Sequence, residues 1–433
     1  MSTPAQFLAQ PLSFPISRRR APNRFLKGAM SERLASWNVA PLQRGVPSRE
    51  LIQLYETWGR GQIGMLVTGN IMVDPAHLEA VGNPAVPFDS ALSGQRFDAF
   101  QALARAGKRH GSLMIAQISH PGRQCDARIQ SSPISASDIQ LKGPAMGIQH
   151  FARPRAATPA ELAAIVSHFA FTAHYLERAG FDGVELHAAH GYLLAQFLSP
   201  ATNTRADAYG GPGIHGRARL LTSIVRAIRA HTSPGFVLGV KLNSVEFQAG
   251  GMRTDDAREL CAALEAMGCV DFVELSGGTY EAPAFAHRKE STRRREAFFI
   301  EFAEAIRPVL RTTRVYLTGG FRTAGAMAEA LGTVDGVGLG RVLCHEPFLC
   351  RDLLAGKARG AAGDLVGGED VSMSNACALM QIWRIAQGLE PWDAASAEGM
   401  KALSHTIGKY AREFRRADFT GSDDFRTRVL ARL

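Results

Sequence analysis

Short apolar runs and longer segments with helical spacing alternate along most of the chain. A continuous apolar run of roughly four to eight residues between turns is typical of a buried parallel strand, whereas apolar positions three and four residues apart predict an amphipathic helix. The apolar runs predict strands at residues 24–30, 64–72, 112–119, 183–187, 236–243, 270–277, 314–320 and 336–341.

The clearest helix is predicted at residues 160–179, where apolar side chains share one face at the 3.6-residue period. Thr158 and Glu161 form a capping box at its start, Pro159 suits its first turn, and Gly180 ends it. Weaker helical patterns occupy residues 49–60, 89–110, 216–231, 255–267, 295–311 and 346–355.

This alternation predicts an α/β fold in which an all-parallel sheet closes into a (β/α)8 TIM barrel. A doubly wound open sheet is the alternative, but it would need a phosphate-binding loop after its first strand, and residues 28–31 do not form one. Residues 59–64 match G-x-G-x-x-G, yet they lead from a helix into a strand. Because this order is the reverse of a dinucleotide fingerprint, we expect a helix end and a turn there.

Two segments lie outside the repeating pattern. The long connection after the third strand, residues 123–158, is rich in Ser, Pro and Gly and is expected to fold over the barrel mouth. We assign residues 1–356 to the barrel and residues 357–433 to a helical C-terminal extension, with helices at 370–387 and 394–415. The extension has no obvious core of its own, so it is expected to pack on the barrel or on a second subunit of a homo-oligomer.

Composition narrows the class of protein. With 46% hydrophobic and 21% charged residues, and no apolar run long enough to span a bilayer, a globular protein without membrane insertion is expected. The net charge of +9 favours an anionic partner, either a phosphorylated cofactor or nucleic acid. The basic clusters at 18–20 and 293–295 are not interleaved with aromatic residues, so nucleic acid is the less favoured partner.

The cysteines point to a compartment. They are scattered without a C-x-x-C pair, which predicts no zinc site, no iron–sulfur cluster and a reducing, cytoplasmic location. An acid-poor start also fits a transit peptide, although Pro4, Pro11 and Pro15 would interrupt the amphipathic helix that such a peptide needs.

Candidate chemistry concentrates in residues 180–211, where the fourth predicted strand ends in His187, His190 and Tyr192. Catalytic groups of a barrel lie at the carboxyl ends of its strands. The two histidines could be metal ligands, but no carboxylate or cysteine lies at a suitable spacing, so donors to a substrate oxygen are favoured. Tyr192 is either a proton donor or an aromatic packed at the rim.

Further polar or glycine positions end other predicted strands. Lys241 on the fifth strand either points outward or stabilises an anion at the mouth, and Gln117 on the third strand is either a cofactor contact or a buried amide satisfied by the backbone. The glycines at 319–320 and 338–340 end the seventh and eighth strands, where barrels often bind phosphate; tight turns are the alternative.

The stretch GFDGVELHAAHGYLLAQFLSPATNTRADAYGG resembles the signature of the old yellow enzyme family, the FMN-dependent ene-reductases. The resemblance extends in order over most of residues 23–350. It includes Asn23-Arg24, Ala29-Met30-Ser31, Gln117-x-x-His120-x-Gly122-Arg123, Val240-Lys241-Leu242-Asn243, Thr318-Gly319-Gly320 and Gly338-Leu339-Gly340-Arg341.

The resemblance implies FMN at the mouth of the barrel. For the cofactor, the resemblance places Ala29, Met30 and Ser31 along the flavin, Gly69 and Gln117 at its pyrimidine edge, and Lys241 near N1 and O2. It places Gly319, Gly320, Gly340 and Arg341 at the phosphate. For the substrate, it places His187 and His190 on the carbonyl or nitro oxygen and makes Tyr192 the proton donor. Ser31 departs from the Thr or Cys more usual in the family. Residues 214–217 replace its Glu-Asn-Arg run, which leaves the role of Arg217 open.

By resemblance, NAD(P)H reduces FMN, and a hydride then passes to the β carbon of an activated alkene while Tyr192 protonates the α carbon. A barrel acting on another substrate, such as a dienoyl thioester, and a non-catalytic flavin-binding protein are the alternatives. The iron–sulfur cysteines and extra nucleotide domains of the dienoyl reductases are missing from this sequence. The choice between NADH and NADPH stays open. The basic net charge leans slightly to NADPH, with Arg288, Lys289 and residues 293–295 as candidate contacts for its additional phosphate, but solvated loop charge is the favoured interpretation of these residues.

Overall fold

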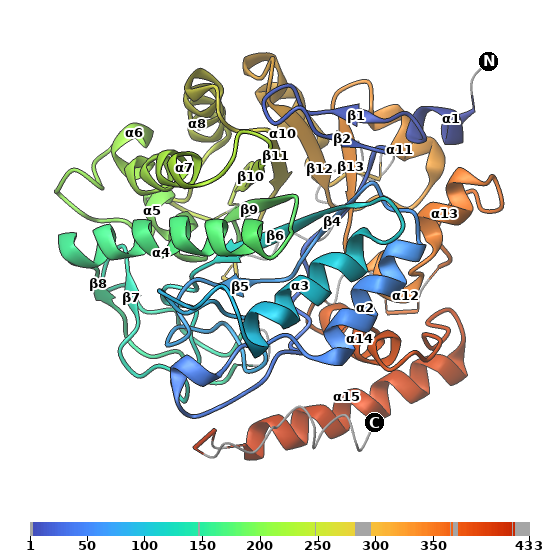
Figure 1. Cartoon of the computed structure of the whole chain (residues 1–433), viewed down its shortest axis with the longest axis horizontal. Coiled ribbons are helices and arrows are strands. Elements are labelled where there is room, and N and C mark those ends of the chain that lie inside the picture. Colours follow the sequence, from blue (N-terminus) through green and yellow to red (C-terminus); the bar gives the residue numbers. More distant parts are fainter. Residues whose placement is uncertain are drawn as a thin grey trace.

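The computed structural model describes residues 3–145, 148–246, 248–281, 296–363, 365–366, 371–417 and 419–420. In it, parallel strands close into a barrel surrounded by helices (Figure 1). Strand β3 pairs with both β13 and β4, and β4 pairs with β6, so the sheet has no open edge. The barrel order is β3 (Phe25–Lys27), β4 (Met65–Val67), β6 (Leu113–Ser119), β9 (Gly183–Ala188), β10 (Val237–Asn243), β11 (Phe272–Ser276), β12 (Arg314–Thr318) and β13 (Gly336–Leu339). The predicted (β/α)8 barrel is confirmed, and the open sheet is excluded.

The second predicted strand is interrupted. It is divided into β4 and β5 (Ile71–Met72), and β5 continues along β6. Between them, the Gly69 N–H donates to Glu32 Oε1 at 2.8 Å. A side chain on Gly69 would collide with the Met30 carbonyl oxygen and the Glu32 carboxylate. This close approach of two segments explains the break and places Asn70 at the mouth.

The predicted helices are present, some of them shorter than their sequence patterns. Predicted helix 89–110 begins only at Gln95, after a Ser- and Gly-containing turn, and 295–311 contains α10 and a 3-10 turn at Pro308, whose missing N–H interrupts the helical bonding. The helix α11 (Ala324–Ala330), between β12 and β13, was not predicted. The outer helices are α2 (Arg49–Arg60), α3 (Gln95–Lys108), α4 (Pro159–Arg178), α7 (Arg219–His231), α8 (Thr254–Met267), α10 (Ile300–Ile306), α11 and α13 (Leu349–Leu354); shorter ones are α1 (Pro4–Leu8), α5 (Leu193–Leu198), α6 (Ile214–Arg217) and α12 (Val342–His345).

The hairpin of β1 (Leu12–Ser13) and β2 (Arg20–Ala21) lies at the amino-terminal end of the barrel, opposite α15 (Figure 1). Phe14 is fully buried and packs on Phe272, within a core cluster that includes side chains of six barrel strands. The basic cluster at 18–20 forms the end of this hairpin, where Arg19 donates to the Gly235 carbonyl. Arg19 therefore has a structural role at the amino-terminal end of the barrel.

The connection 123–158 carries the short strands β7 (Ile134–Ser135) and β8 (Arg155–Ala156) and a small apolar cluster that Tyr280 contacts. The extension contributes α14 (Val371–Ala386) and α15 (Ala397–Arg416). Trp383 of α14 donates to the Glu32 carbonyl at 2.7 Å, and Arg33 donates to the Tyr410 hydroxyl of α15 at 2.9 Å. The extension thus packs on the barrel of its own chain.

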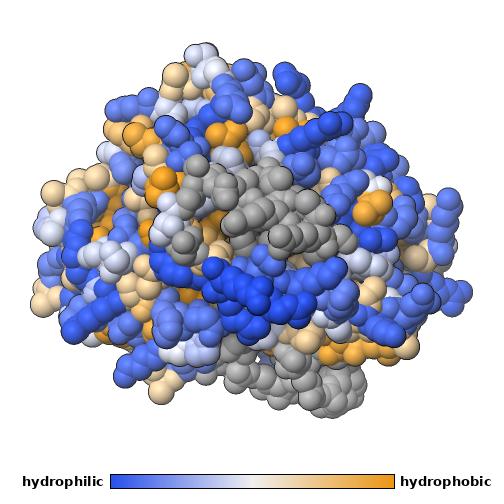
Figure 2. Space-filling model, turned by 90° about the horizontal axis from the view of Figure 1, so that it is seen from below, coloured by the Kyte–Doolittle hydropathy of each residue, from blue (hydrophilic) through white to orange (hydrophobic). Residues whose placement is uncertain are grey.

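The outer side of the extension is polar. α15 buries Leu403 and Phe414 and exposes Lys401 and Arg412. The view onto this end of the molecule shows a mainly hydrophilic surface with scattered hydrophobic spots (Figure 2). Among the helices that the structure describes, none has both the length and the apolarity that crossing a bilayer requires.

Candidate active site

A cavity of about 1130 Å³ opens at the carboxyl ends of the strands. Pockets for one small molecule are usually roughly 300–1000 Å³, so this cavity is at the upper end of that range. Residues of the extension, including Ser374, Leu379 and Tyr410, form part of its wall. The lining includes every site residue predicted from the sequence: Ala29, Met30, Ser31, Gly69, Gln117, His187, His190, Tyr192, Lys241, Gly319, Gly320, Gly340 and Arg341.

The two histidines belong to a chain of hydrogen bonds at the end of β9. His187 Nδ1 lies 2.9 Å from Asn70 Oδ1, and His187 Nε2 lies 3.2 Å from His190 Nδ1. His190 Nε2 lies 3.0 Å from the Ser276 hydroxyl. His190 can face back toward His187 because its backbone is left-handed, with φ 58°, and its N–H donates to Asn243.

Burial keeps both imidazoles neutral. It lowers the pKa of His190 to about 3 and that of His187 well below its ordinary value, and each pKa is lowered further by a nearby positive charge. A neutral imidazole has one donor and one acceptor nitrogen. The pair can therefore polarise a bound oxygen through hydrogen bonds but does not supply a full positive charge.

Tyr192 immediately precedes α5 and packs its ring 4.2 Å from that of His187. It is 4% exposed, and its hydroxyl lies 3.0 Å from the hydroxyl of Tyr280, which follows β11. Burial raises the pKa of Tyr192 well above its ordinary value, so the phenol stays protonated at neutral pH. Tyr280 was not predicted; its position just after a barrel strand was the available signal.

Lys241 is paired with a carboxylate that was not predicted. Its Nζ lies 2.6 Å from Oε1 of Glu274, its neighbour across β10 and β11, and the Thr318 hydroxyl donates to the same oxygen. Burial alone would raise the pKa of Glu274, but Lys241 and the hydrogen bonds hold it below its usual range. The ammonium charge is thus balanced within the wall.

Glu185 behaves in the opposite way. It accepts a hydrogen bond from Gln117 Nε2 at 2.7 Å, and burial beside the ionised Glu274 raises its pKa well above its ordinary value. Glu185 is therefore protonated. Glutamates inside the apolar strands β9 and β11 were the sequence signal for this pair of carboxylates.

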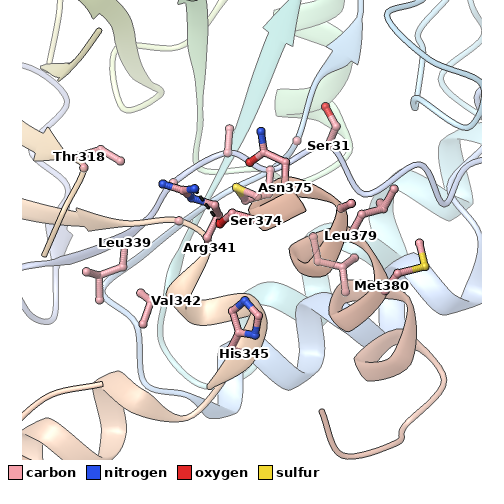
Figure 3. A pocket seen from close by; sticks show the side chains of 18 of the residues that line it. Ser31, Thr318, Leu339, Arg341, Val342, His345, Ser374, Asn375, Leu379 and Met380 are labelled. Atoms are coloured by element: carbon pink, nitrogen blue, oxygen red, sulfur yellow. Dashed lines mark hydrogen bonds between the residues drawn. The ribbon is translucent and has the colours of Figure 1, made fainter. Parts of the chain in front are cut away.

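The opposite end of the cavity is suited to an anion. Arg341 Nη1 donates to the Ser374 hydroxyl at 2.7 Å, with Asn375 of the same helix nearby (Figure 3). Gly319 and Gly320 adopt φ 130° and 93°, which favour glycine and expose the backbone between β12 and α11. Apolar side chains also line the cavity, among them Met30, Leu339, Val342, Leu379 and Met380. A lining that combines a guanidinium, amide and ammonium groups and apolar side chains fits a flavin with a phosphate tail.

A further buried network surrounds Ser31. Its hydroxyl donates to Glu79 Oε2 at 3.1 Å, and Glu79 Oε1 lies 3.1 Å from Arg33, which in turn donates to Tyr410. The Ser31 proton is thus engaged by the protein, and only its oxygen lone pairs face a ligand. Glu79, Arg33 and Tyr410 were not predicted, because the first two come from loops and the third from the extension.

Two of the residues named from the sequence have structural partners. The Gly69 N–H is occupied by Glu32, so it does not point into the cavity. Arg217 is fully buried and donates to Asp256 at 2.8 Å, where it joins α6 to the start of α8. Arg217 does not line the cavity.

A cluster of possible metal ligands, Asp74, His77 and His120, was also not predicted. His77 Nδ1 lies 2.7 Å from Asp74, and His120 Nδ1 accepts the Gly122 N–H at 3.0 Å. An acceptor Nδ1 places the His120 proton on Nε2, where a metal would have to bind. The hydrogen bonds therefore favour a structural role for this cluster.

The fold and the cavity define a flavin-dependent oxidoreductase built on a barrel. Residues 15–359 match the model of the NADH:flavin oxidoreductase / NADH oxidase family. The chain belongs to this family, which makes it an enzyme of the old yellow enzyme type whose cofactor is FMN.

The relatives agree with this assignment. The chain is 50% identical to the NADH-dependent flavin oxidoreductase nadA of Aspergillus parasiticus over 92% of this chain and 89% of that one. It is 36% identical to the NADH-dependent flavin oxidoreductase iccE of Talaromyces variabilis over 79% and 85%. A solved structure of morphinone reductase with tetrahydroNAD shares the fold, with TM-score 0.67, 24% identity and coverage of 84% of this chain and 96% of that one.

Proposed function

We propose that the enzyme reduces an alkene conjugated to a carbonyl or nitro group, with NADH as the reductant. The observation that carries the proposal is the buried, protonated Tyr192 packed against the neutral His187–His190 pair in one cavity. An oxygen-binding pair and a proton donor are the two protein functions that reduction of such an alkene requires.

Bound FMN supplies the hydride, which it receives from NADH. His187 Nε2 and His190 Nδ1 face each other at 3.2 Å, and a substrate oxygen that binds there withdraws electrons from the conjugated C=C bond. Tyr192 donates its hydroxyl proton to the α carbon, and Tyr280 hydrogen-bonds the phenol oxygen. The β carbon gains the hydride, the α carbon gains the proton, and NADH becomes NAD⁺.

NADH rather than NADPH is proposed because the relatives nadA and iccE are both named as NADH-dependent. The net charge favoured NADPH slightly, with Arg288, Lys289 and residues 293–295 as contacts for its additional phosphate. Those residues lie outside the described part of the chain. We also propose that the extension acts together with the barrel, since α14 and α15 line the same cavity.

Stopped-flow measurement of the separate half-reactions of Tyr192→Phe tests the proposal. NADH should bleach the flavin at the rate of the unaltered enzyme, because the phenol has no role in that step. Reoxidation by 2-cyclohexenone should slow by roughly 10²–10⁴-fold, the usual contribution of a positioned proton donor.

Tyr209→Phe is the matched control, since Tyr209 does not line the cavity. Equal rates of reoxidation in Tyr192→Phe and the unaltered enzyme would refute the role of Tyr192. Failure of NADH to bleach the flavin without oxygen would favour a non-catalytic flavin-binding protein. Activity confined to thioesters would favour the dienoyl thioester alternative.

A further inference from the structure

Asn70 lies in the break between β4 and β5 and lines the cavity. It is 3% exposed, and its Oδ1 lies 2.9 Å from His187 Nδ1. Its side chain also hydrogen-bonds Tyr192 and lowers the pKa of that phenol, against the larger effect of burial. One amide thus contacts both the oxygen-binding imidazole and the proton-donating phenol.

The Asn70 amide determines where His187 carries its proton. A carbonyl oxygen only accepts, so the contact with Oδ1 requires the proton on Nδ1, and Nε2 is then an acceptor. His190 Nδ1 at 3.2 Å is the donor to that nitrogen, and His190 Nε2 accepts from the Ser276 hydroxyl. In this arrangement, His187 has no N–H directed toward a substrate oxygen.

We propose that Asn70 is a positioning residue that holds the His187 proton on Nδ1. A substrate oxygen then has a single imidazole donor, the His190 Nδ1 N–H, which exchanges His187 Nε2 for that oxygen when the substrate binds. The inference rests on the proposed function of the cavity. It differs from the expectation that both histidines donate to the substrate oxygen.

The amide N–H of Asn70 acts on Tyr192. When the Tyr192 O–H bond breaks and its proton goes to the α carbon, the electron pair stays on the phenol oxygen. The Asn70 N–H and the Tyr280 hydroxyl then stabilise that phenolate until solvent returns a proton. Asn70 therefore assists proton transfer while it limits the number of donors at the oxygen site.

Two substitutions separate these effects, with 4-hydroxybenzaldehyde as the probe of the oxygen site. In Asn70→Ala the His187 proton is free to move to Nε2, so a second donor faces the phenol oxygen of 4-hydroxybenzaldehyde. We expect roughly tenfold tighter binding, the effect of one hydrogen bond to a charged group. In Asn70→Asp the carboxylate holds the His187 proton on Nδ1 and repels the phenolate form of 4-hydroxybenzaldehyde, so binding of this probe should weaken by roughly tenfold. Flavin absorbance reports both affinities.

Proton transfer is measured by single-turnover reoxidation of the NADH-reduced enzyme with 2-cyclohexenone. Asn70→Ala should slow it by roughly tenfold or more, since a hydrogen bond to the developing phenolate is lost. In a Tyr192→Phe background it should add no further slowing, because the phenol on which it acts is missing. Asn38→Ala, an amide outside this cavity that bonds Gln43, is the control.

Weaker phenol binding in both Asn70→Ala and Asn70→Asp, or the same slowing in both backgrounds, would overturn the inference. Asn70→Val replaces Asn70→Ala if the latter loses FMN or its native circular dichroism. Loss of flavin reduction by NADH in the unaltered enzyme would instead refute the proposed function. The phenol titrations do not depend on NADH, so the two failures are distinguishable.

Discussion

At the scale of single residues, two glutamates in similar strand contexts differ in charge. Glu274 lies 2.6 Å from Lys241 and has a lowered pKa, whereas Glu185 bonds the neutral Gln117 and has a raised pKa. Both are fully buried. The neighbour on the adjacent strand, rather than the degree of burial, therefore decides which carboxylate is ionised.

This difference predicts that replacing each glutamate by glutamine lowers the free energy of unfolding by a different amount. Glu274→Gln leaves the Lys241 ammonium buried without its partner, so the free energy of unfolding should fall by roughly 3–5 kcal/mol. Glu185→Gln replaces a protonated acid by an amide of the same shape and should cost about 1 kcal/mol or less. Urea unfolding of both FMN-loaded variants measures this. Equal costs would mean that the two carboxyls carry the same charge.

At the scale of elements, α14 supports the segment after β3 that lines the cavity. Trp383 is buried and donates to the Glu32 carbonyl, while the Glu32 carboxylate holds the Gly69 N–H. The Arg341–Ser374 bond joins the same helix to the anion end (Figure 3). The helix therefore stabilises the cavity from outside the barrel.

Substitution of Trp383 tests this role. Trp383→Ala removes a large buried ring, so the free energy of unfolding should fall by roughly 3–5 kcal/mol and FMN should be released more readily. Trp383→Phe keeps most of the packing and loses one hydrogen bond, about 1 kcal/mol. Denaturation and flavin fluorescence measure the two effects. Lys401→Ala on the exposed side of α15 is the control, and unchanged FMN retention in Trp383→Ala would contradict the role.

At the scale of the whole molecule, barrel and extension share one hydrophobic core that includes Phe25, Trp383 and Leu403. A ligand bound at the mouth contacts both parts and should stabilise them together. FMN at about 100 times its Kd should add about 2.7 kcal/mol to the free energy of unfolding.

Removal of the phosphate locates its site. Riboflavin at the same concentration should raise the melting temperature less than FMN, because it lacks the phosphate that we propose Arg341 binds. In Arg341→Ala, the shift with FMN should fall to that with riboflavin, whereas Ser374→Ala keeps the guanidinium and retains most of the difference. An unchanged difference between FMN and riboflavin in Arg341→Ala would move the phosphate elsewhere in the cavity.

The local pattern of apolar and polar residues determined the positions of the barrel strands, the start of α4 and the location of the motif after β9. The alternation of apolar runs and helical spacing predicts each barrel strand, and the capping box of Thr158 and Glu161 marks the start of α4 as the structure has it. The motif after β9 also predicts that His187, His190 and Tyr192 lie at the mouth, because parallel strands direct their carboxyl ends to one side.

Only the tertiary structure decided the protonation and the hydrogen-bond partners of those groups. Asn70 and His187 are 117 positions apart in sequence, and Lys241 and Glu274 are 33 positions apart, yet each pair is in hydrogen-bond contact. Protonation and tautomer depend on burial and on the partner across the cavity, and closure of the barrel brings those partners together. For that reason the sequence by itself determines where the chemistry lies, while the folded chain decides which atoms carry the protons.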